Sequence, residues 1–193
     1  MKTPLRYQLT EYDCAPTCFF NALLCIFDRE EIPIAIVKNI YKYTLDEMGQ
    51  SGVLGEWGTS SKAVRNLIHW LNVFDNSNEL GLNVELLDCD NQFAKIRQCV
   101  ADGGCVVARC YQTNEHYILI TDMDEDFAYV WDPYYLDSDY YDNDDCVDII
   151  EGQKLYNRMV RLCRLRNKEK KDFSLISGGK RELVMINRVK SVE

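Results

Sequence analysis

Apolar residues follow one another almost without a break between positions 15 and 27, where only Pro16, Thr17 and Asn21 interrupt them. Such a run is typical of a helix that is buried on most of its faces. Pro16 fits the first turn of that helix, because the N–H group that proline lacks has no helical partner there. The pattern therefore predicts a buried helix over residues 15–27.

Two further helices are predicted before residue 75, and a loop with four glycines separates them. The first spans residues 33–43. The second follows the loop at 45–60, is capped by Thr59 or Ser60, and ends at Leu71. The residues expected to face the core are Ile34, Val37, Ile40 and Tyr41 in the first helix, and Ala63, Leu67, Trp70 and Leu71 in the second.

After Asn72 the spacing of the apolar residues shortens, which predicts strands. Residues 82–87 and 105–111 are typical of strands, and a helix over 91–101, ended by Gly103 and Gly104, lies between them. Residues 116–123 and 127–131 flank a short acidic turn, so we expect them to form an antiparallel hairpin.

The last third of the chain begins with a loop over residues 134–148 that is dense in Tyr and Asp. A helix over 153–165 follows, and then a hairpin in which 173–176 and 183–189 meet around Gly178 and Gly179. Helices followed by an antiparallel sheet are typical of an α+β fold. We expect one domain over residues 1–193, with a helical lobe (1–75) and a sheet lobe (80–193).

The composition suits a folded domain of 193 residues, of which 47% are hydrophobic and 27% charged. The uncharged stretch over residues 14–27 is shorter than the roughly 20 apolar residues that span a bilayer, and the N-terminus lacks the apolar core of a signal peptide. The nine cysteines have no regular spacing, which indicates reduced thiols. We therefore expect a cytoplasmic protein without membrane insertion.

Charge is distributed unevenly around a net value of −9. Residues 157–193 hold 11 basic and four acidic residues, so residues 1–156 hold the other 11 basic and 27 acidic residues, a net charge of −16. A body this acidic repels a phosphate backbone, and the basic tail lacks the interspersed aromatic residues of a single-strand binder. Nucleic acid is therefore not an expected partner, and we expect the tail to pack against the acidic body.

Histidine chemistry has only His69 and His116 to use. His69 lies inside a predicted helix, where a structural or surface role is expected, whereas His116 opens a buried strand directly after a polar turn. Cys14 lies at the start of the first buried helix, where unpaired N–H groups and a partial positive charge favour a thiolate. The cysteines placed inside elements, where cysteine behaves as a small hydrophobe, are Cys18, Cys25, Cys105 and Cys110.

Two polar residues complete the set that a cysteine hydrolase needs. Asp132 ends the second strand of the hairpin that His116 opens, so the hairpin brings the two side chains together. A carboxylate there would fix the tautomer of the imidazole and stabilise the imidazolium. Gln8 lies six residues before Cys14, and its side-chain amide could donate to an oxyanion together with the Cys14 N–H.

The order and spacing of Gln8, Cys14, His116 and Asp132 resemble those of papain-like cysteine peptidases. The closer resemblance is to the branch that cleaves double-glycine leaders from bacteriocin precursors, and it covers about residues 5–135. It implies that Cys14 is the nucleophile, His116 the general base, Asp132 the acid that orients His116, and Gln8 the oxyanion donor. It also implies a papain-like two-lobed fold with the site between the lobes, a peptide or protein substrate, and no metal or organic cofactor.

Three features depart from that branch. Ala15 stands where the branch usually has Gly, which would narrow the substrate groove or alter the turn. The chain lacks the transporter modules that accompany the processing peptidases, and residues 135–193 align with nothing in the resemblance. Trp57, in the glycine-bearing loop, either lines a cleft with Ala15 or packs in the core, and packing is the commoner role of a large aromatic residue.

Other kinds of site are weaker predictions. Cys14 and Cys18 could share a metal, but no further pair of ligands completes a tetrahedral set. The loop over 137–145 holds five carboxylates but lacks the central Gly and terminal Glu of a calcium loop, so a solvated loop is favoured over a cation site or a rim that selects basic substrates.

The expected function is that of a cysteine hydrolase, which cleaves a peptide or amide bond through a covalent thioester. Two alternatives stay open. The same thioester could be resolved by an amine, as in an acyltransferase of similar fold. The chain could also be a catalytically silent module that holds a peptide in the old cleft.

Overall fold

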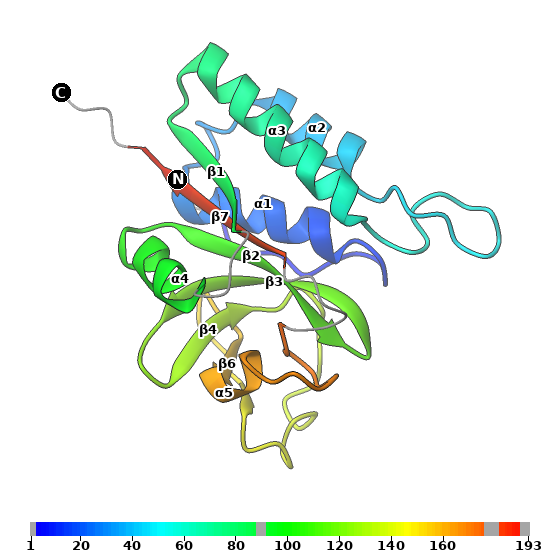
Figure 1. The fold of residues 1–193 in the computed structure, drawn as a ribbon, viewed down its shortest axis with the longest axis vertical. Helices are drawn as coiled ribbons and strands as arrows, with labels where there is room; N and C mark the ends of the chain where they lie inside the picture. The colour runs from blue at the N-terminus through cyan, green and yellow to red at the C-terminus, as the bar shows by residue number, and fades with distance from the viewer. Residues whose placement is uncertain (1–2, 88–91, 176–181, 190–193) are drawn as a thin grey trace.

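The computed structural model describes residues 3–87, 92–175 and 182–189 (Figure 1). Its strands form one antiparallel sheet in the order β1-β7-β2-β3-β4-β6-β5, so the predicted α+β class is confirmed. The helices are α1 (Cys14–Ile26), α2 (Ile34–Tyr43), α3 (Ser61–Asn78), α4 (Gln92–Ala101) and α5 (Leu162–Leu165). The strands are β1 (Leu82–Leu87), β2 (Cys105–Gln112), β3 (Asn114–Met123), β4 (Phe127–Trp131), β5 (Val147–Ile149), β6 (Arg158–Arg161) and β7 (Leu183–Arg188).

The sheet separates two hydrophobic cores. Helix α1 packs directly on β2 and β3, with α2 and α3 on the same side of the sheet (Figure 1). This core includes Phe19, Leu67 and Leu119, whereas the core on the other face, under α4 and α5, includes Ile96 and Val160. Successive strand residues point to opposite faces, so neighbouring residues of β3 reach different cores.

The predicted N-terminal helices are present, but two details of the prediction are wrong. Helix α3 continues past Leu71 to Asn78, because Asn72 and Asp75 accept hydrogen bonds from the backbone of β1 and hold the helix along that strand. Helix α2 is rotated from the predicted stripe. Ile36 and Ile40 are buried, whereas Ile34 is 67% exposed and Tyr41 is 51% exposed, because α2 packs on α1 and α3 through the face that carries Ile36 and Ile40.

The predicted hairpin is confirmed. Strands β3 and β4 pair antiparallel, with Leu119 opposite Trp131, and a bulge lies between Ile120 and Asp122. Strand β2 pairs with the other edge of β3, which places β3 in the interior of the sheet with Ile118 and Ile120 fully buried. The start of β3 and the end of β4 are thereby fixed side by side.

The predicted helix over 153–165 is wrong. The segment contains the strand β6, which pairs with β4 from Val130 opposite Arg158 to Phe127 opposite Arg161, and only the single turn α5 is helical. The apolar residues matched a helical period, but β4 would otherwise expose an unpaired edge, and pairing satisfies its backbone groups. Along β6 the buried side chains alternate, with Arg158 and Val160 inward.

The predicted final hairpin is also wrong. Strand β7 lies between β1 and β2 and pairs with both, rather than with residues 173–175, the described part of the segment predicted to pair with it. Val184 and Ile186 of β7 belong to the α1-side core and Leu183 to the other core, so β7 is buried on both faces. Phe173 has a φ of +66° and lies outside any strand. Gly178 and Gly179 lie outside the described residues.

Candidate active site

The first residues of the chain are held against the end of β4. The Trp131 Nε1–H donates to the Arg6 carbonyl (2.9 Å), and the Gln8 N–H donates to the Pro133 carbonyl (2.9 Å). The Tyr134 hydroxyl donates to the Glu11 carboxylate (3.0 Å). The segment that leads into α1 is thus bound to the residues on either side of Asp132.

Cys14 is the first residue of α1, at the end where helix N–H groups lack helical partners. The turn before it is organised by Asp13, whose carboxylate accepts hydrogen bonds from the N–H groups of Leu9 (3.0 Å) and Thr10 (2.6 Å). Both Asp13 and Cys14 are 8% exposed. The thiol is therefore held at a fixed position on a rigid helix.

His116 and Asp132 are in direct contact. The His116 Nε2 lies 2.8 Å from Asp132 Oδ1, and both side chains are buried, with Asp132 fully so. Because Nε2 is hydrogen-bonded to Asp132, Nδ1 is the ring nitrogen available for a hydrogen bond with Cys14, whose side chain interacts with His116. The structure thus brings together the three side chains that the sequence analysis proposed as a triad.

Electrostatics favour the protonated form of His116. Burial opposes a charge on the ring, but the negative charges of Asp132 and Cys14, together with hydrogen bonds to both, outweigh burial and raise the pKa of His116 to about 10. At neutral pH the imidazole therefore carries a proton whenever Cys14 is a thiolate. Such a thiolate–imidazolium pair is the reactive form of an activated cysteine.

Two other cysteines lie near this pair but have different surroundings. Cys18 and Cys110 are fully buried, and burial, reinforced by the negative charges of Cys14 and Asp132, raises the pKa of both thiols well above the ordinary value. The Cys18 thiol donates to the Tyr117 carbonyl (3.2 Å). They remain protonated and inert, as expected of cysteines used as small hydrophobes.

Gln8 lies beside the triad, but its amide does not point freely into a cleft. The Gln8 Nε2 donates to the Thr10 carbonyl (2.6 Å), while Gln8 Oε1 is buried and has no hydrogen-bond partner among the described residues. One of the two hydrogens on Nε2 is used by Thr10, so one remains for an oxyanion.

The sequence analysis missed the residues that surround Asp132. The carboxylate accepts further hydrogen bonds from the Tyr134 N–H (2.9 Å) and from Gln112 Nε2 (3.2 Å). Asn157 binds the Asp132 backbone on both sides, because its Oδ1 accepts from the Asp132 N–H (2.7 Å) and its Nδ2 donates to the Asp132 carbonyl (2.8 Å). Arg158 Nε lies 3.9 Å from Asp132 Oδ2. Little in the sequence indicates this role, because Arg161 and Arg164 interrupt the apolar residues of the same segment in the same way as Asn157 and Arg158.

The two residues predicted to bind substrate lie in different surroundings. Ala15 is fully buried in the α1-side core, so it lines no surface. Trp57 is 64% exposed, so the prediction that it packs in the core is wrong. Its loop, in cyan in Figure 1, projects beyond the start of α3, and a Cβ added at the adjacent Gly58 would lie 3.4 Å from the Tyr12 carbonyl. Trp57 is therefore exposed near the turn that precedes Cys14.

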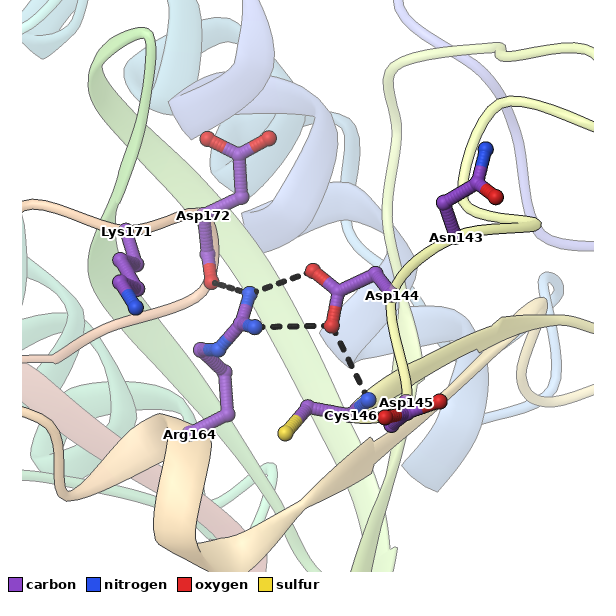
Figure 2. Close-up of a pocket in the computed structure, with 7 residues that line it drawn as sticks. All are labelled: Asn143, Asp144, Asp145, Cys146, Arg164, Lys171 and Asp172. Atoms are coloured by element: carbon purple, nitrogen blue, oxygen red, sulfur yellow. Dashed lines mark hydrogen bonds and ion pairs between the residues drawn. The ribbon is translucent and has the colours of Figure 1, made fainter.

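The acidic loop is bound to the basic tail (Figure 2). Arg164 donates from both terminal nitrogens to Asp144 (2.8 Å each) and from Nη1 to the Asp172 carbonyl (3.4 Å), beside a cavity of about 470 Å³. The Asp144 charge is thus neutralised inside the protein.

The same region reaches the triad through a chain of hydrogen bonds. The Tyr141 hydroxyl donates to Asp172 (3.1 Å) and accepts from Gln112 (3.4 Å), the residue that binds Asp132. The acidic loop therefore helps to hold Gln112 in place.

The described part of the chain holds no cluster of three or more His, Cys, Asp or Glu side chains that could bind a metal ion. It also contains no helix with the length and apolar character needed to cross a bilayer. Neither the models of known protein families nor the curated proteins provide a match to this chain. The chemistry of the site must therefore be argued from its own geometry.

Proposed function

We propose that the protein is a cysteine hydrolase that cleaves a peptide or amide bond through a covalent thioester. The observation that carries the proposal is the buried contact between His116 and Asp132 beside a cysteine at the start of a helix. A nucleophile, a base beside it and a third group that orients the base are the arrangement that covalent catalysis requires.

In the proposed reaction the Cys14 thiolate attacks the carbonyl carbon, and the negative charge moves to the carbonyl oxygen. The Cys14 N–H and the second hydrogen of Gln8 Nε2 stabilise this oxyanion. His116, which already holds the proton of the thiol, gives it to the leaving amine as the C–N bond breaks. Water then attacks the thioester while His116 takes one of its protons; the C–S bond breaks, the carboxylic acid leaves, and Cys14 returns as a thiolate beside protonated His116.

We further propose that the arrangement is a variant of the papain-like fold in a cytoplasmic protein. The fold is supported by a helix that carries the cysteine and packs on a strand that carries the histidine. A reducing location is supported by seven cysteines that are free thiols: Cys14, Cys18, Cys99, Cys105, Cys110, Cys146 and Cys163. A peptide or protein substrate follows from the same proposal.

The test is the alkylation rate of each cysteine. The reduced protein is treated briefly with limiting iodoacetamide at pH 6, and the labelled peptides are quantified by mass spectrometry. An ordinary thiol with a pKa of about 8.5 is almost entirely protonated at that pH. We expect Cys14 to react at least about tenfold faster than Cys163, which is exposed and serves as the internal reference.

The control variants are His116→Ala and His69→Ala. The first should abolish the rapid reaction of Cys14, whereas the second should leave it unchanged, because His69 is exposed on α3. If Cys14 reacts no faster than Cys163, the hydrolase proposal is wrong and a silent peptide-binding module is favoured. If Cys14 reacts rapidly, added amines that capture the thioester would separate acyl transfer from hydrolysis.

A further inference from the structure

Arg158 is a charged side chain in an unusual place. It is 1% exposed, on β6, where the register opposite Val130 puts it beside the end of β4. Its Nη1 donates to the Asn157 carbonyl (2.8 Å) and its Nη2 to the Tyr134 carbonyl (3.3 Å). Its Nε makes no hydrogen bond within the described residues and lies 3.9 Å from Asp132 Oδ2.

A buried guanidinium is costly unless a negative charge lies near it. Among the described residues, Asp132 is the only carboxylate within ion-pair distance of Arg158. The two carbonyl acceptors orient the guanidinium but do not neutralise it. The burial of Arg158 is therefore explained by its pairing with the carboxylate that holds His116.

The same pairing balances the charges of the site. Ionised Asp132 and Cys14 with protonated His116 would leave one net negative charge in a buried region, and Arg158 neutralises it. The other titratable groups that interact with this cluster all have a raised pKa and carry no charge at neutral pH; they are Cys18, Cys110, Tyr117, Tyr134 and Tyr141. Arg158 is thus the one additional fixed charge within ion-pair distance of Asp132 in the described part of the site.

We propose that Arg158 is a positioning residue of this active site, whose guanidinium neutralises the Asp132 carboxylate and keeps it directed at His116. The inference rests on the proposed function. It assigns a role to the part of the chain that the family resemblance does not cover, because Arg158 and its neighbour Asn157 both lie beyond residue 135. Arg158 acts through Asp132 and touches neither the thiol nor the substrate.

The experiment is the pH profile of Cys14 alkylation in Arg158→Gln. Without the guanidinium, the buried site loses a fixed positive charge, which disfavours the negatively charged, reactive form of Cys14. The acid limb of the profile is the pH range in which the alkylation rate of Cys14 rises with pH. We expect this limb to lie about one pH unit higher in the variant, so that the reaction at a pH on the limb is about tenfold slower. Arg161→Gln is the matched control, because Arg161 is on the same strand but exposed and bound to the Asp145 carbonyl. It should leave the limb unchanged.

Two further variants separate a charge effect from a packing effect. Arg158→Lys keeps the positive charge and should move the limb back toward that of the wild type. Gln112→Glu places a second carboxylate beside Asp132 at a half-buried position and should raise the limb without altering Arg158, so it decides the matter if Arg158→Gln does not fold.

An acid limb that stays in place in Arg158→Gln would overturn the inference, even if the variant is less stable. If Arg158→Gln does not fold, an acid limb that stays in place in Gln112→Glu would overturn it. Equal effects of Lys and Gln at position 158 would also overturn it. The proposed function would survive such a result, because it depends on the rapid reaction of wild-type Cys14 and its loss in His116→Ala.

Discussion

His116 links the chemistry of the site to the stability of the fold. Its pKa of about 10 in the folded protein lies above the ordinary value of 6.5, so the folded state binds this proton more tightly than the unfolded state. The resulting stabilisation is complete below pH 6.5, declines as the pH rises, and is lost above about pH 10. We therefore expect the difference in unfolding free energy between the wild type and His116→Gln to shrink from pH 6 to pH 10.

Urea unfolding at pH 6, 8 and 10 measures that difference. His69→Gln serves as the control, because an exposed imidazole should show no such trend. A difference that stays constant would mean that folding does not raise the pKa of His116, and a difference that grows with pH would mean that His116 is buried as a neutral ring.

Some residues of the candidate site could be predicted from the sequence and others could not. Cys14 was found from its place before a helix, and His116 with Asp132 from the geometry of a hairpin, because these are local patterns. Arg158 was not found, since arginine is rarely buried and only the folded sheet shows that a carboxylate lies beside it. The amide of Gln8 points to Thr10 because of a local turn, which spacing alone does not reveal.

At the level of elements, Ser60 connects the glycine-bearing loop to α3. Its Oγ accepts from the Ala63 N–H (3.1 Å) as the N-cap, and its own N–H and hydroxyl donate to Asp46 (2.8 and 2.6 Å). Ser60→Ala removes the cap and one of the bonds to Asp46, so we expect a loss of about 1–2 kcal/mol in unfolding free energy. Ser77→Ala, near the other end of α3 and exposed, should change it by less than about 0.5 kcal/mol. If urea unfolding gave equal losses of unfolding free energy for the two variants, the capping role of Ser60 would be refuted.

Helices and strands could be predicted from the sequence where the apolar pattern within the segment itself determines its conformation. Strands β1 and β4 have the predicted bounds, because the apolar residues within each segment are enough to predict it. Strand β6 was not predictable, since its conformation depends on the unpaired edge of β4, which is distant in sequence. The pairing of β7 was not predictable for the same reason, because its partners β1 and β2 lie about 80 to 100 residues earlier in the chain.

At the scale of the whole molecule, the C-terminal residues complete the sheet. Strand β7 is hydrogen-bonded to both β1 and β2, and β1 pairs with no other described strand. Removing residues 182–193 would therefore detach β1, open both cores at Val184 and Leu183, and leave Arg109 without its bonds to Glu182. We expect the chain that ends at residue 181 to lose cooperative unfolding in urea and its near-ultraviolet circular dichroism.

Arg188→Ala is the control for that truncation, because it removes an exposed ion pair with Glu31 and the contact of the guanidinium with the Phe27 ring but leaves β7 in place; it should cost about 1 kcal/mol. The truncation tests which residues belong to the cooperative folding unit. The family resemblance ends near residue 135, and a domain complete at that point would tolerate the truncation. A truncated chain with the wild-type unfolding midpoint would show that residues 182–193 are an appendage to the folded unit. Loss of folding would instead mean that the helices, the sheet and the tail form one cooperative unit, so that Arg158 belongs to the same unit as Cys14.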